Sequence, residues 1–160
     1  RNEIVKSAQA NGVEWLFFLD TDVVVPPDTI TRLMSYNLPI VSGVYWTRAP
    51  PLEPAVWREV PNGKQTIQFQ PNQMIEADFI GAGCLLVNMS VFDKLERPYF
   101  NWTLSFQDPN DFGKGTSEDF DWCKKVRARG YKILVDTSLQ CRHAITNGYA
   151  DYRGINISEI

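Results

Sequence analysis

The sequence has no long apolar run, no excess of basic residues and few cysteines, and each shortage excludes a class of protein. No apolar stretch approaches the about 20 residues that a membrane-spanning helix needs, and no charged-then-apolar leader opens the chain. With 16 basic against 19 acidic residues the net charge is −3, so we expect no nucleic-acid partner. The three cysteines form no CxxC pair, which argues against a zinc site and a disulfide framework and favours a reducing, cytoplasmic setting.

What the chain does contain is typical of one globular α/β domain. It has 160 residues, of which 44% are hydrophobic and 22% charged, enough for a sizeable core. Hydrophobic spacing predicts helices over 1–11, 27–36, 90–95 and 117–129, and strands over 15–19, 39–46, 74–89 and 131–136. The opening order of helix, strand, helix, strand indicates part of a parallel sheet.

Two segments interrupt this alternation. Residues 47–74 are rich in proline, and the Asn62-Gly63 pair predicts a turn in a β-hairpin insertion. Residues 98–116 are aromatic, polar and punctuated by Pro and Gly, so we expect a long surface loop. Loops of that length in compact domains are usually functional or mobile.

An acidic pair closes the first predicted strand in WLFFLDTDVVV. In extended backbone, residues two apart point to the same side, so Asp20 and Asp22 would present their carboxylates together. Such a pair can bind a divalent cation and leave coordination positions for water and phosphate oxygens. Aspartates after a strand also commonly solvate a turn, and that alternative stays open.

A second acidic group opens the last predicted helix in GTSEDFDW. Thr116 and Asp119 have the spacing of a capping box, and Glu118 also falls in the first turn, where the helix dipole favours negative charge. Most acidic helix starts are only caps. A carboxylate at this position can also act as a general base for a hydroxyl within hydrogen-bond reach.

The single histidine, His143, follows the last predicted strand. A lone histidine is more often a surface or packed residue than a ligand. As a ligand, however, it would join Asp20 and Asp22 in a set that favours Mn²⁺ or a similar ion over Ca²⁺.

Four features in this order along the chain resemble the GT-A glycosyltransferases, closest to the family 2 pattern. They are the strand with Asp-Thr-Asp, the segment IGAGCLLV, the Glu-Asp helix start and the late histidine. The resemblance implies a partial GT-A, Rossmann-like mixed sheet flanked by helices. Residues 1–160 would form a single domain that corresponds to the C-terminal two-thirds of the family fold, with 47–74 as a hairpin insertion.

The resemblance also implies residue roles. Asp20, Asp22 and His143 would hold the Mn²⁺ or Mg²⁺ that bridges the diphosphate of a nucleotide-sugar. Asp119 would be the catalytic base, and Glu118 would orient or bind the acceptor. The segment that lies against the donor sugar or acceptor would comprise Gly81, Ala82 and Gly83.

Two further residues have polar or aromatic side chains suited to substrate binding. Trp46 can stack on a sugar ring, and Arg48 can hold a phosphate bidentately. The alternatives are a packing tryptophan and a solvated loop charge.

The chain departs from the family at its start, because only 19 residues precede Asp20. Family members carry an upstream strand and helix units that grip the nucleotide. That portion either precedes Arg1 in a longer protein or comes from a second chain, or else donor binding is weak.

The first hypothesis is therefore metal-dependent transfer of a sugar from a nucleotide-sugar to a hydroxyl of a sugar, lipid or protein acceptor. One alternative is a truncated, non-catalytic module that binds sugar or metal and needs a partner chain. Another is a nucleotidyltransferase, which also uses acidic pairs for metal and phosphate.

Overall fold

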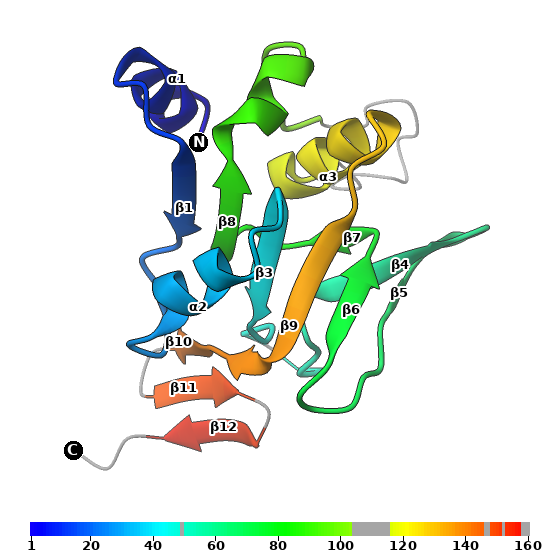
Figure 1. Cartoon of the computed structure of the whole chain (residues 1–160). Helices are drawn as coiled ribbons and strands as arrows, with labels where there is room; N and C mark the ends of the chain where they lie inside the picture. The colour runs from blue at the N-terminus through cyan, green and yellow to red at the C-terminus, as the bar shows by residue number, and fades with distance from the viewer. Residues whose placement is uncertain (49, 104–115, 146–147, 152, 158–160) are drawn as a thin grey trace.

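The computed structural model describes residues 1–48, 50–103, 116–145, 148–151 and 153–157. These residues form a mixed α/β fold with a central five-stranded sheet and two smaller sheets (Figure 1). The predicted α/β class is confirmed. Within these ranges, no helix is both long enough and apolar enough to span a membrane.

The central sheet has the strand order β1-β8-β3-β9-β6. Its strands are β1 (Trp15–Leu19), β8 (Cys84–Asn88), β3 (Ile40–Val44), β9 (Ile133–Gln140) and β6 (Met74–Ala77). β3 pairs with β9 in parallel, whereas the other three pairings are antiparallel. β1, β3 and β9 therefore end where β8 and β6 begin, and we call this the lower edge, as it lies in Figure 1.

The expected parallel neighbours are not neighbours. β1 and β3 run in the same direction, but β8 lies between them and is antiparallel to both. β8 is buried along almost its whole length because it has a strand on each side and a core on each face. The mixed sheet is confirmed, and the prediction of a parallel start to it is wrong.

Successive side chains of a strand point to opposite faces, so this sheet has two cores, one on each face. Leu85 and Val87 of β8 pack in the core that includes residues of α1 (Asn2–Ala10) and α3 (Glu118–Ala128). Leu86, between them in sequence, belongs to the core that includes Leu33 of α2 (Thr29–Ser35). Each fully buried Leu or Val contributes roughly 1.5–3 kcal/mol of burial free energy, so both cores stabilise the central sheet.

A second sheet extends from the lower edge. It has the order β12-β11-β10-β2 and comprises β12 (Gly154–Ile157), β11 (Gly148–Asp151), β10 (Arg142–Ile145) and β2 (Val23–Val24). His143 lies inside β10, where it pairs with Val23 and with Ala150.

This position of His143 corrects the sequence-based boundary, because the strand expected to end at Asp136 continues to Gln140. Polar residues after Asp136 led the prediction to stop early. Thr137 is in fact fully buried, and its hydroxyl oxygen accepts a hydrogen bond from the Gln73 backbone N–H at 2.8 Å. A polar side chain with such a partner is tolerated inside a buried strand.

The hairpin insertion supplies two of the three strands of the third sheet. The sheet comprises β4 (Val56–Val60), β5 (Gly63–Thr66) and β7 (Phe79–Ile80), in the order β5-β4-β7. The predicted hairpin is confirmed, but its two-residue loop is Pro61–Asn62, because Val60 pairs with Gly63. The expected helix at 90–95 is a 3-10 helix, Met89–Lys94, and most of the predicted surface loop, residues 104–115, lies outside the described residues.

Candidate active site

The two aspartates of the Asp-Thr-Asp motif lie in a turn between β1 and β2. The backbone N–H of Val23 donates to the carbonyl oxygen of Asp20 at 3.0 Å, which closes a turn over residues 20–23. The expectation of extended backbone is therefore wrong here. In the turn the two carboxylates have different partners, Arg1 for Asp20 and Arg48 with His143 for Asp22, and they form two clusters instead of one.

The first cluster surrounds the guanidinium of Arg1. Its Nη2 lies 2.7 Å from Asp20 Oδ1, and its Nη1 lies 3.3 Å from Glu118 Oε1. Its Nε lies 3.4 Å from Asp119 Oδ1. Three carboxylates thus share one guanidinium, which leaves excess negative charge at this end of the lower edge. We call these four residues the Arg1 cluster.

Asp119 is the most enclosed carboxylate of the Arg1 cluster, with its side chain 17% exposed. Its Oδ2 accepts the backbone N–H of Ala82 at 3.1 Å. Its buried Oδ1 makes no hydrogen bond within the described part of the chain. The expected capping box is absent: Ser117 is the N-cap and makes no side-chain cap bond.

Burial raises the pKa of Asp119, although Arg1 and the Ala82 N–H each lower it. A desolvated carboxylate with a raised pKa and an oxygen that lacks a donor is suited to accept a proton.

The second cluster joins Asp22 to His143, and we call these two residues the metal pair. Asp22 Oδ2 lies 3.3 Å from His143 Nε2 and 2.9 Å from Arg48 Nη1. His143 Nδ1 lies 2.7 Å from the carbonyl oxygen of Trp46, which can only accept, so Nδ1 carries the ring proton. In the neutral imidazole, Nε2 then presents its lone pair to a carboxylate oxygen, an arrangement that a cation would stabilise.

The metal pair has a separation that fits one ion. Bonds of about 2.1 Å at right angles place neighbouring ligand atoms about 3 Å apart, close to the 3.3 Å observed between Asp22 Oδ2 and His143 Nε2. Across the described ranges, no group of three or more His, Cys, Asp or Glu side chains could hold a metal. The expected third ligand, Asp20, instead contacts Arg1. Two protein ligands would leave the remaining positions to water and substrate.

Tyr45 contacts both the glycine segment and His143. Its hydroxyl oxygen accepts the backbone N–H of Gly83 at 3.3 Å, and its ring meets the His143 ring edge-on with centroids 5.4 Å apart. A Cβ placed on Gly81 would lie 1.8 Å from the Tyr45 hydroxyl oxygen, so only glycine fits there. Burial raises the pKa of Tyr45, which keeps its hydroxyl neutral.

The glycine segment therefore supports the site instead of lining it. Gly81, Ala82 and Gly83 are all buried, and Tyr45 and Asp119 take up the surface that the sequence analysis had assigned to a sugar. Of the other predicted binding residues, Trp46 is half-buried beside the metal pair. Arg48 is exposed and bound to Asp22.

Arg1 and Tyr45 are site residues that were not predicted from the sequence. No local signal marks Arg1, because its partners lie 19 and 117 residues away along the chain. For Tyr45 a signal was available. It follows a buried strand, and two glycines spaced two apart in IGAG predict a bulky group packed against them.

The raised pKa of Asp119 predicts how the free energy of unfolding depends on pH. Its folded-state pKa lies above the ordinary 3.8, so the folded protein binds this proton more tightly than the unfolded chain. The contribution of Asp119 to the free energy of unfolding therefore falls as pH rises from 3.8 through the folded pKa. Replacing Arg1 by Gln should raise that pKa further and extend the fall to higher pH.

A carboxyl ¹³C titration of Asp119, with urea unfolding across the same pH range, measures this effect. Lys6→Gln removes an exposed positive charge that, among the described residues, pairs with Glu3 alone, and it serves as the matched control. An Asp119 titration curve that is the same in the Arg1→Gln and Lys6→Gln proteins would contradict the assignment.

Comparison with known proteins adds a fold relationship. No family model matches the chain, and no curated protein matches it. The crystal structure of A197 from STIV is similar, with a TM-score of 0.65 and 17% identity, over 100% of this chain and 81% of that one. At that identity the likeness concerns the mixed α/β fold alone.

Proposed function

We propose that this chain carries the catalytic centre of a metal-dependent glycosyltransferase of the GT-A type. It would move a sugar from a nucleotide-sugar to an acceptor hydroxyl. The observation that carries the proposal is the metal pair, in which His143 Nε2 faces Asp22 Oδ2 at 3.3 Å while Nδ1 is tied to a backbone carbonyl. A hydrogen bond that fixes the ring tautomer in this way is typical of histidines that bind metals.

Asp22 and His143 would hold Mn²⁺ or Mg²⁺. When bound, the ion neutralises the charge that develops on the departing diphosphate. Arg48 supplies a second positive group beside the same carboxylate. It is exposed and has five N–H donors, so it can turn from Asp22 to a phosphate oxygen of the donor.

Asp119 would remove the proton from the acceptor hydroxyl. As its Oδ1, which accepts no hydrogen bond within the described residues, takes that proton, the hydroxyl oxygen bonds to the anomeric carbon, and the bond from that carbon to the diphosphate breaks. The Ala82 N–H holds the other carboxylate oxygen. Arg1 would keep Asp20, Glu118 and Asp119 together despite their like charges, and Glu118 would orient the acceptor.

Calorimetric titration with Mn²⁺ tests the metal pair. We expect Asp22→Ala and His143→Ala each to weaken binding by more than about a hundredfold, since second-shell changes alone cost 10- to 100-fold in metal sites. Asp93→Ala, which removes an exposed aspartate of the 3-10 helix, is the control. Wild-type affinity in the Asp22→Ala/His143→Ala double variant would refute the site.

A further inference from the structure

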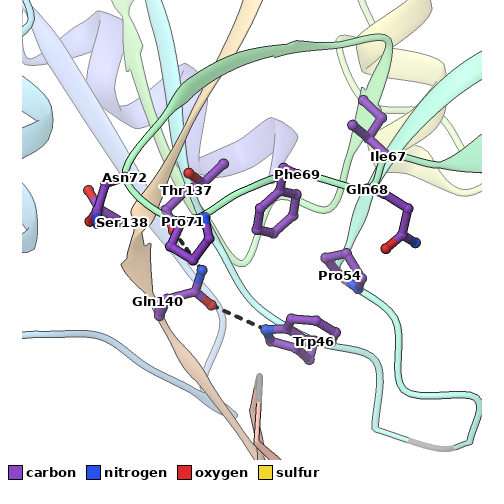
Figure 2. A pocket seen from close by; sticks show the side chains of 10 residues that line it. All are labelled: Trp46, Pro54, Ile67, Gln68, Phe69, Pro71, Asn72, Thr137, Ser138 and Gln140. Atoms are coloured by element: carbon purple, nitrogen blue, oxygen red, sulfur yellow. Dashed lines mark hydrogen bonds between the residues drawn. The ribbon is translucent and has the colours of Figure 1, made fainter.

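A cavity of about 560 Å³ opens at the lower edge (Figure 2), and it is lined in part by Trp46, whose carbonyl oxygen lies 2.7 Å from His143 Nδ1. Its walls come from the end of β3, the end of β9 and the segment 67–72 that precedes β6. Figure 2 shows Trp46, Phe69 and Pro71 bordering the same space. The volume lies within the range of roughly 300–1,000 Å³ that small-molecule sites occupy.

The lining of this cavity is aromatic and polar, and none of its side chains is charged. A phosphate, a carboxylate or a cation would find no counter-charge here, which disfavours an ionic ligand. Trp46 and Phe69 offer apolar rings, while Gln68 and Asn72 offer amide donors and acceptors. A sugar ring has apolar C–H faces and a rim of neutral hydroxyls, so it matches both kinds of group.

Trp46 is held in position before any ligand arrives. Its indole N–H donates to Gln140 Oε1 at 3.3 Å, and Gln140 Nε2 donates to the carbonyl oxygen of Thr137 at 2.6 Å, as the dashed lines in Figure 2 show. A fixed aromatic surface lowers the entropy that a ligand must give up on binding. The carbonyl oxygen of Trp46 accepts the hydrogen bond from His143 Nδ1, while the Trp46 side chain lines the cavity. Trp46 therefore contacts both the cavity and the metal pair.

The side-chain amides of Gln68 and Asn72 are available to a ligand. Within the described ranges, the side chains of Gln68 and Asn72 make no hydrogen bond, and both residues are exposed. Asn72 has a φ of 62°, a left-handed conformation that asparagine tolerates and that turns the segment around the cavity.

We infer that this cavity binds the neutral sugar units of an oligosaccharide, with Trp46 as the stacking surface. That these sugars belong to the acceptor rests on the proposed function, whereas sugar binding itself does not. The inference narrows the acceptor from any hydroxyl compound to a neutral glycan that extends from the metal pair past Trp46.

Binding is tested without donor and without metal. Cellobiose, lactose, maltose and mannobiose are titrated at millimolar concentrations into ¹⁵N-labelled protein, and the indole N–H signal of Trp46 is followed. We expect at least one of them to bind saturably, and Trp46→Ala to weaken that binding by at least about tenfold. Trp46→Phe should keep part of the affinity. These side-chain changes leave the backbone carbonyl that binds His143 in place.

Trp102→Ala is the matched control, because Trp102 is 60% exposed and lies outside the cavity. Asp22→Ala should bind the sugar as wild type does. Saturable binding that Trp46→Ala abolishes, in a protein that shows no transferase activity, would support the cavity and count against the proposed function. Failure of all four sugars to bind, or an unchanged acceptor KM in an active Trp46→Ala enzyme, would overturn the inference alone.

Discussion

Replacing Asp119 by Asn is expected to lower the rate of sugar transfer by about a hundredfold to ten-thousandfold. An amide has nearly the same shape as a carboxylate but does not take up a proton at neutral pH. Because the Ala82 N–H can still donate to the amide oxygen, the start of α3 should keep its structure. The loss would therefore report on proton transfer and not on folding.

Single-turnover kinetics with a panel of UDP- and GDP-sugars and neutral oligosaccharide acceptors measure this loss. Asp121→Asn is the matched control. Asp121 lies in the same turn of α3, but its carboxylate pairs with Lys125 and accepts the Asn101 N–H, away from the Arg1 cluster. We expect Asp121→Asn to keep more than about a third of the activity. Equal activity of the two variants would show that Asp119 is not the base.

A Gly81→Ala substitution should destabilise the fold by about 1–3 kcal/mol. The added Cβ would lie 1.8 Å from the hydroxyl oxygen of Tyr45, closer than any non-bonded contact allows. Tyr45 cannot simply withdraw, because it is buried, lies against Gly83 and contacts the His143 ring. The clash must therefore be relieved by moving the backbone, the Tyr45 ring or both.

Urea unfolding of Gly81→Ala, Tyr45→Phe and the double variant tests this clash as a thermodynamic cycle. Removing the hydroxyl leaves the nearest ring atom 2.8 Å from the new Cβ, so we expect the double variant to be more stable than the sum of the single effects implies. Strict additivity would mean that Tyr45 is not what requires glycine at position 81. Activity should fall as well, because Gly81 precedes the Ala82 N–H that holds Asp119.

Local patterns in the chain were sufficient for the elements that form through neighbouring residues. The 3.6-residue spacing of apolar side chains predicted α1 and α3 to within two residues of their observed ends, and the apolar run at 15–19 predicted β1. The proline-rich insertion was also recognised as a hairpin, since turn residues act over a few positions. Asp22, His143 and Asp119 were singled out because their order along the chain resembles the GT-A pattern.

The sheet order and the partners of the site residues depend on contacts between segments far apart in the sequence. No local sequence pattern encodes such contacts. The antiparallel insertion of β8 between β1 and β3 depends on contacts among segments more than 40 residues apart. The turn at 20–23, which sends Asp20 to Arg1 and Asp22 to His143, depends on the backbone of Gly83 and Ala144 accepting and donating hydrogen bonds across the lower edge. Arg1 meets Glu118 across 117 residues of sequence. Such contacts depend on the packing of both cores, because the burial of those cores sets which strand ends meet.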